Sequence, residues 1–239
     1  DRSRQPAAHL VGVHLGFEGR PGHVHVLQPH SAIFCRTSTE ASVTGSDRST
    51  LMLARFALNH SIRATARGAE LDADNKEWQK TDDALFLGSE SPIEATLRCS
   101  QDSENIYFLI EVQDDNLSDS DNVTIMLSPE LENGRLASKA RRIKVGCNGL
   151  KNTDQYSGGW RSMDLGVTAK AAYDGTIGNN SDKDNGYLVE VKVPRSAVEI
   201  TGGRLLMNFA LFDSAGAFED AVSGTAATDT KKWIAINNL

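Results

Sequence analysis

Short apolar runs with a period of two, separated by turn-forming residues, constrain the fold of this chain more than any other feature. In the run YLVEVKV at 187–193, the tyrosine and the three valines occupy every second position, and Glu190 and Lys192 lie between the valines. Because successive side chains of a strand point to opposite faces, this pattern predicts a half-buried strand. Four other runs have a similar composition: 105–112, 123–127, 142–147 and 205–212. The last is apolar along nearly its whole length, which is typical of a central strand.

Turn formers lie between these runs. They are the triplets ENG at 132–134, CNG at 147–149, SGG at 157–159, GNN at 178–180 and TGG at 201–203. Helical signals are few, and the clearest is a single turn at 195–198, directly after a proline. Short strands punctuated in this way predict an all-β chain, folded as an antiparallel β-sandwich of the jelly-roll kind.

Composition excludes several classes of protein. The 239 residues are 39% hydrophobic and 24% charged, which allows an ordinary core. The net charge of -7 argues against a nucleic-acid partner, since phosphate binding needs a basic surface. The sequence contains no run of 18 apolar residues, so no transmembrane helix is predicted. The three cysteines show no zinc-ligand spacing, and Cys99 and Cys147 are interpreted as buried free thiols rather than a disulfide.

Histidine usage marks a boundary near residue 58, because five of the six histidines precede it. We therefore expect an N-terminal β segment at 1–58 and a larger sandwich at 59–239. A segment of about 58 residues is near the lower size limit for an independent hydrophobic core. The segment is expected to pack on the larger domain or to be the tail of a preceding propeller.

Several segments after residue 61 follow one another in a characteristic order. They are AELDADNKEW at 69–78, ATLRCSQDSENIYFLIEVQDDNL at 95–117, SDNVTIMLSP at 120–129, NGYLVEVKVPRSAVEI at 185–200, LLMNFALFDSAG at 205–216 and KKWIAINNL at 231–239. This order resembles the family-9-like carbohydrate-binding modules, and the resemblance implies a β-sandwich that binds a glycan. Trp78 and Trp233 are interpreted as core residues.

The chain departs from that family where the sugar is held. Family members clamp the sugar between two aromatic rings, but the matching segments here, 117–120 and 223–232, contain none. A family carboxylate would fall near Thr124, whereas Asp121 is retained and Lys144 stands where the family has an arginine. The resemblance therefore implies the fold more strongly than it implies the family's sugar site.

The best candidates for glycan contacts lie elsewhere. Tyr156 and Trp160 flank a glycine-containing loop, and aromatic faces suit the C–H face of a pyranose. Lys144 and Arg142 could donate hydrogen bonds to hydroxyl groups. The alternative is that both rings fold back onto the edge of the sandwich and that the two cations lie on a solvated strand face.

The acidic run at 114–121 is a candidate calcium site. Its members are Asp114, Asp115, Asp119 and Asp121. Calcium binds six to eight oxygen atoms, which clustered carboxylates can supply. The spacing does not fit an EF-hand, and the alternative is an acidic loop in water.

These observations favour a non-catalytic carbohydrate-binding module of a secreted glycan-processing protein, linked to further domains and located outside the cell, in the periplasm or on the cell surface. No GxSxG, HExxH or P-loop motif is present, so no catalytic residue is proposed. Two alternatives stay open. One is the C-terminal part of a sialidase-like glycoside hydrolase, because STEASVTG at 38–45 resembles a degenerate Asp-box. The other is a spacer domain without a ligand.

Overall fold

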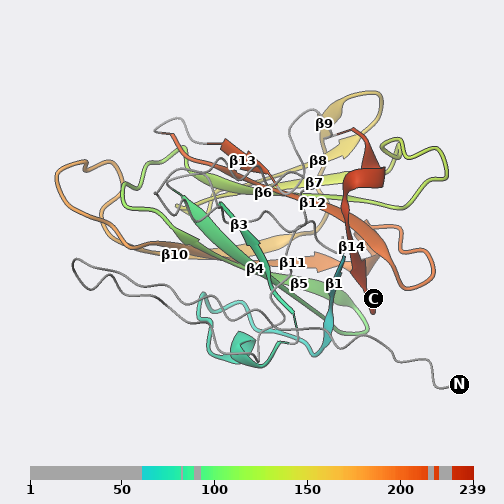
Figure 1. Cartoon of the computed structure of the whole chain (residues 1–239), viewed down its shortest axis with the longest axis horizontal. Helices are drawn as coiled ribbons and strands as arrows, with labels where there is room; N and C mark the ends of the chain where they lie inside the picture. The colour runs from blue at the N-terminus through green and yellow to red at the C-terminus, as the bar shows by residue number, and fades with distance from the viewer. Residues whose placement is uncertain (1–60, 82, 89–92, 215–217, 221–227) are drawn as a thin grey trace, which may run out of the picture. The chain divides into compact units, whose positions relative to one another are not determined.

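The computed structural model describes residues 61–239, except 82, 89–92, 215–217 and 221–227 (Figure 1). The expected N-terminal segment 1–58, with its histidines and its Asp-box-like stretch, lies outside the described residues. No helix within the described ranges is long and apolar enough to cross a membrane.

Two sheets form the described part of the chain. The first follows the order β1 (Ser61–Arg63), β14 (Ile234–Asn237), β12 (Leu205–Phe212), β6 (Asn122–Ser128), β7 (Arg141–Gly146), β8 (Lys151–Tyr156) and β9 (Trp160–Ser162), and β13 (Phe218–Asp220) also pairs with β12. The second follows the order β10 (Thr168–Asp174), β11 (Gly186–Pro194), β5 (Asn105–Gln113), β4 (Glu94–Gln101) and β2 (Thr65–Ala66), and β3 (Leu85–Leu87) also pairs with β4. The described residues also form three short 3-10 helices: η1 (Glu77–Lys80), η2 (Arg195–Ala197) and η4 (Thr230–Lys232).

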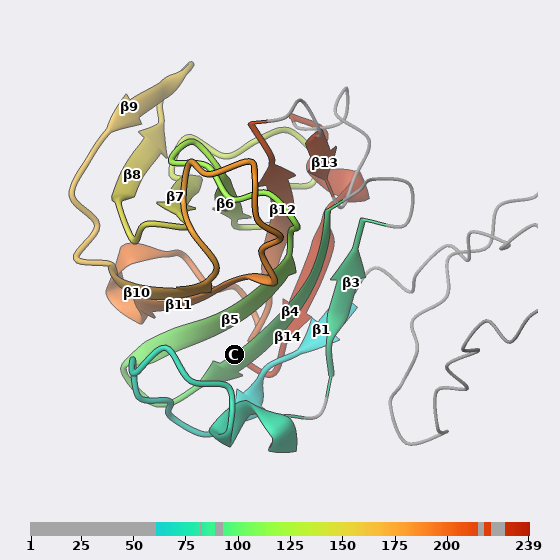
Figure 2. The same ribbon diagram turned by 90° about the vertical axis from the view of Figure 1, so that its left-hand side faces the viewer.

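The predicted sandwich is confirmed. Figure 2 shows the two sheets as two layers, with β6, β7, β8 and β12 above β4, β5, β10 and β11. All five predicted strands occur with ends shifted by no more than one residue, and η2 is the single turn expected after the proline. Most neighbouring strands are antiparallel, but β1 pairs with β14, and β2 with β4, in parallel.

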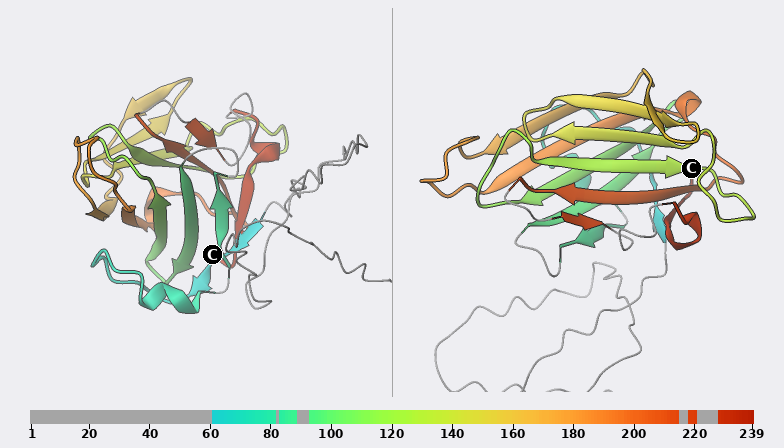
Figure 3. Two further views of the ribbon diagram at one scale, coloured as in Figure 1. Left: turned by 60° about the vertical axis from the view of Figure 1, so that its left-hand side comes forward. Right: turned by 90° about the horizontal axis from the view of Figure 1, so that it is seen from above.

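Figure 3 shows the two layers from two further sides. The core lies between the layers and is formed by alternate side chains of their strands. Val189, Val191 and Val193 of β11 are fully buried there, as their period of two predicts. Phe209 of β12 packs in the same cluster. Each such side chain contributes about 1.5–3 kcal/mol when fully buried, so the alternation fixes which face of each strand looks outward.

Segment 69–81, which contains η1, covers part of the outer face of the six-stranded sheet. Trp78 is only 2% exposed and packs on Tyr107 and Leu109. Its Nε1 donates to Glu190 Oε1 at 2.9 Å, and the backbone N–H of Ala73 donates to Glu190 Oε2 at 2.6 Å. The prediction that Trp78 is a core residue is confirmed, and another part of the outer face stays open.

Glu190 occupies the face that its sequence pattern assigned to polar residues, yet only 1% of it is exposed. Burial under segment 69–81 raises the pKa of its carboxyl group, and the two N–H donors oppose part of that rise. Cys99 and Cys147 are buried free thiols, as predicted, and Trp233 is also buried.

Candidate functional site

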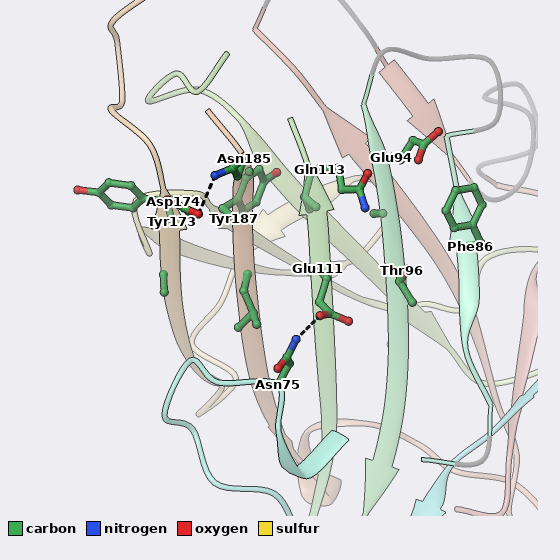
Figure 4. Close-up of a pocket in the computed structure, with 15 residues that line it drawn as sticks. Asn75, Phe86, Glu94, Thr96, Glu111, Gln113, Tyr173, Asp174, Asn185 and Tyr187 are labelled. Carbon is green, nitrogen blue, oxygen red and sulfur yellow. Dashed lines mark hydrogen bonds between the residues drawn. The ribbon is translucent and has the colours of Figure 1, made fainter. Parts of the chain in front are cut away.

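An open groove of about 500 Å³ lies on the uncovered part of the outer face of the six-stranded sheet (Figure 4). Strands β3, β4, β5, β11 and β10 cross it from one end to the other, and segment 69–81 borders it. Its lining side chains with polar or aromatic groups are Asn75, Phe86, Glu94, Thr96, Glu111, Gln113, Tyr173, Asp174, Asn185 and Tyr187. The groove therefore combines carboxylates, amides, a threonine hydroxyl and aromatic rings.

Strand alternation places most of these side chains on the outer face. On β4, Ala95 and Leu97 point into the core, so Glu94 and Thr96 point into the groove. On β3, the same rule directs Phe86 outward, where 56% of it is exposed. A phenylalanine exposed to that degree within a strand is available to a ligand.

Aromatic residues stand near both ends of the groove. Phe86 belongs to β3, whereas Tyr173, 51% exposed, belongs to edge strand β10, and Figure 4 shows its ring extending beyond that edge. Strands β3 and β10 are separated by four strand spacings, which amounts to about 19 Å. The groove is therefore long enough for a chain of several sugar rings lying across the strands. Strand alternation places Tyr173 on the same side of β10 as Ala169 and Ala171, which pack on the core, so Phe86 rather than Tyr173 faces outward.

Hydrogen bonds hold two of the groove's carboxylates in place. Asn75 Nδ2 donates to Glu111 Oε1 at 2.7 Å, and Asn185 Nδ2 donates to Asp174 Oδ2 at 2.9 Å. Each carboxylate oxygen has two lone pairs, so both groups can accept further hydrogen bonds from ligand hydroxyl groups. Fixed planar acceptors beside an exposed ring are suited to sugar recognition, in which hydroxyl groups and a C–H face are read together.

The residues predicted from the sequence to bind a glycan lie on the other sheet. Trp160 and Tyr156 meet across the β8–β9 hairpin, with ring centroids 5.4 Å apart and planes at 69°. The Arg142 guanidinium lies 4.8 Å from the Trp160 ring centroid and also pairs with Asp154 at 2.8 Å. Lys144 is exposed two residues further along β7. The structure thus brings three of the four together, with Arg142 already engaged by two partners.

Both rings are half-buried and pack against a small cluster that includes Met126, Leu136 and Trp233. This packing agrees with the alternative interpretation, in which both rings fold back onto the sandwich. Each ring nevertheless keeps part of its surface exposed.

A buried acidic group lies where the two sheets meet at one end. It consists of Asp114, Asp121 and Asp213, with carboxylate oxygens all within 4.8 Å of one another and exposures of 6%, 0% and 4%. Asp115 and Asp119, also proposed from the sequence, are exposed and do not belong to this group. Asp213 was not identified from the sequence. The pairing of β12 with β6 aligns Phe212 with Asn122, so Asp213, which follows β12, lies beside Asp121.

The crowding of these carboxylates has an electrostatic cost. Burial raises the pKa of Asp114 to about 6, and the nearby Asp121 and Asp213 add to the rise against one backbone hydrogen bond from Asn116. Burial, together with Asp121, also raises the pKa of the Cys147 thiol to about 11, and this thiol donates to Ser118 O at 3.1 Å. In the described part of the chain, no salt bridge neutralises Asp114 or Asp121.

The donor set fits a hard divalent cation. Asp121 accepts backbone N–H bonds from Ser118 and Ser214, which fixes its orientation. The side-chain oxygen of Asn116 is a buried atom with no hydrogen-bond partner, and it follows Asp114 by two residues. Oxygen ligands of this kind are those that calcium prefers.

Comparisons with known proteins agree on the fold. No protein-family model matches the sequence, and no curated protein matches it significantly. A family 9 carbohydrate-binding module from Caldicellulosiruptor kristjanssonii in complex with glucose matches at a TM-score of 0.58 and 18% identity, over 74% of this chain and 94% of that one. Its complex with cellotriose matches at 0.57 and 18%, over 74% and 92%.

A candidate carbohydrate-binding protein of Bacteroides uniformis matches at a TM-score of 0.51 and 10% identity, over 74% of this chain and 98% of that one. At these identities the likeness shows the fold alone. It confirms the sandwich that the sequence resemblance implied.

Proposed function

We propose that this chain is a carbohydrate-binding module and that the groove on the six-stranded sheet is its binding site. The observation that carries the proposal is the exposed Phe86 in an open groove that also contains two carboxylates, Glu111 and Asp174, oriented by side-chain amides. Proteins of the same fold are described in complex with glucose and with cellotriose, which supports a sugar ligand. The groove's length across the sheet favours an oligosaccharide over a single sugar.

The wider setting belongs to the same proposal. A module of this kind serves a secreted glycan-processing protein, such as a glycoside hydrolase, and acts outside the cell, in the periplasm or on the cell surface. Contacts in a shallow groove are individually weak, so linkage to further domains would raise the effective affinity for a polymer.

A glycan array followed by calorimetry tests the groove. Phe86→Ala is expected to weaken binding of the best glycan about tenfold, because the stacking contact is lost. Leu131→Ala removes another exposed apolar side chain, 38% exposed and outside the groove, and should leave the affinity unchanged. Failure to bind any glycan would favour a spacer domain, and an unaltered affinity in Phe86→Ala would remove the groove from consideration.

The surface formed by Tyr156, Trp160, Arg142 and Lys144 stays a second candidate for the same function, favoured by the partly exposed ring pair. Trp160→Ala separates the two surfaces. With binding in the groove, this variant keeps its glycan affinity and loses some thermal stability, because Trp160 packs on Tyr156 and Arg142. Loss of affinity in Trp160→Ala, with Phe86→Ala unaffected, would move the site to β7–β9.

We also propose that Asp114, Asp121 and Asp213 hold a calcium ion, with the side-chain oxygen of Asn116 as a further ligand. Three buried carboxylates so close together repel one another, and a divalent cation would remove that repulsion. Because the three residues lie at the ends of β5, β6 and β12, the ion would tie the two sheets together at this end.

Chelation tests the calcium proposal. At a calcium concentration a hundredfold above Kd, binding stabilises the folded state by about 2.7 kcal/mol. For a domain of this size, that corresponds to a rise in Tm of about 5–10 °C over the EGTA-treated protein. Asp213→Asn should abolish the rise, whereas Asp119→Asn should retain it. A Tm that is the same in calcium and in EGTA would contradict the proposal.

A further inference from the structure

We infer that the groove selects its glycan by charge, preferring chains that carry protonated amino groups to neutral chains and rejecting acidic ones. This inference rests on the proposed function and names its ligand class. Among the described residues, the lining contains three carboxylates, from Glu94, Glu111 and Asp174, and no lysine or arginine. An acidic sugar would bring its carboxylate against this field, whereas an ammonium group would be attracted to it.

The three carboxylates differ in how far other groups already satisfy them. Glu111 accepts from Asn75 and lies 3.9 Å from the Nε of Arg98, which stands outside the groove lining. In the part of the chain that the structure describes, the Asp174 carboxylate accepts a hydrogen bond only from the neutral side-chain amide of Asn185. Glu94 makes no side-chain hydrogen bond or ion pair within the described ranges. Glu94 and Asp174 are therefore negative charges without a cationic partner there.

Glu94 is the residue best placed to read an amino sugar. It belongs to β4, next to β3, so its carboxylate and the exposed Phe86 ring lie at the same end of the groove (Figure 4). A sugar ring resting on Phe86 would bring its substituents toward Glu94. Phe86 would then provide affinity for any sugar ring, and Glu94 would discriminate by charge.

Two glycan tetramers that differ only in acetylation provide the test. The intact protein is titrated at pH 6 with a glucosamine tetramer, with the N-acetylglucosamine tetramer and with a tetramer of galacturonic acid. We expect the glucosamine tetramer to bind more tightly than its acetylated form, on the order of tenfold, because several weak ion pairs add together. The uronic acid chain should not bind measurably. Raising the salt to 0.5 M should erase the difference, since exposed charges are then screened.

Matched variants separate a local effect from the overall negative charge of the chain. Glu94→Gln should weaken binding of the glucosamine tetramer about three- to fivefold and leave the affinity for the acetylated tetramer unchanged. Glu132→Gln makes the same change of charge at an exposed position outside the groove and should alter neither affinity. Phe86→Ala should weaken both chains.

Equal binding of the two tetramers, or equal effects of Glu94→Gln and Glu132→Gln, would overturn the charge selection while leaving a carbohydrate-binding groove intact. Binding of neither tetramer, with other glycans bound on the array, would also overturn it. Only the absence of binding to every glycan would count against the proposed function itself.

Discussion

Replacing Trp78 by alanine is expected to lower the free energy of unfolding by about 3–5 kcal/mol. The indole is almost fully buried against Tyr107 and Leu109, so its removal leaves a large cavity on the outer face of the six-stranded sheet. It also takes away one of the two N–H donors that Glu190 accepts, which leaves a buried carboxylate less well satisfied. Equilibrium denaturation measures the loss, and a stability close to that of the native chain would show that segment 69–81 is not held by this residue.

Trp78→Phe separates packing from hydrogen bonding. The phenyl ring fills most of the space but donates nothing to Glu190, so the expected loss is smaller, about 1–3 kcal/mol. That loss should depend on pH. Burial raises the pKa of Glu190 in the folded state. The contribution of Glu190 to the free energy of unfolding is therefore complete below its unfolded pKa of about 4.3. That contribution is lost as the pH rises through the pKa of Glu190 in the folded state.

The Trp78 N–H bond lowers that folded pKa. Its removal in Trp78→Phe should therefore cost more stability at pH 7 than at pH 4. An equal cost at both values would mean that the ionisation of Glu190 is not linked to folding in this range.

Gly186→Ala is the second substitution for which a large effect is expected. Gly186 begins β11 with φ at +115°, and a Cβ placed on it would lie 2.0 Å from the backbone oxygen of Val112. Strand β5 cannot move aside without breaking its pairing with β11, so the cost combines backbone strain with steric overlap. We expect a loss of at least about 3 kcal/mol, or failure to fold.

Gly178→Ala is the matched control for this substitution. Gly178 also has a positive φ, at +80°, but a Cβ there would meet nothing within 4 Å. It should cost only the strain of the left-handed conformation, about 1–2 kcal/mol. Thermal or chemical denaturation of both variants isolates the steric part, and equal losses would show that the strands can separate locally to admit a methyl group.

The strands could be predicted because their signals are local. The alternation in β11 and the apolar run in β12 each determine a face without reference to any distant residue. The burial of Glu190 could not be predicted in the same way. Its position in the strand predicts an outward-facing side chain. Segment 69–81, more than a hundred residues earlier in the sequence, covers that side chain and excludes water from it.

The groove has no sequence signature for the same reason. Phe86 lies in a run of four apolar residues, 84–87, which predicts a core position, and Glu94, Glu111 and Asp174 are ordinary polar residues of separate strands. Their convergence depends on the order β3, β4, β5, β11 and β10, which no local pattern specifies. The acidic group was found in part, because Asp114 and Asp121 share one loop, whereas Asp213 required knowledge of the β6–β12 register.

The parallel pairing of β1 with β14 has a consequence for the order of folding. It places Ser61 beside Ala235, so the eight-stranded sheet gains its outermost strand only when residues from opposite ends of the described chain meet. Closing so long a loop adds little to the free-energy cost, about 0.6 kcal/mol for each doubling of length, but contacts distant in sequence slow folding. The local pairs β4–β5 and β6–β7 should therefore form early, and protection of β1 against hydrogen exchange should be the last to appear during refolding.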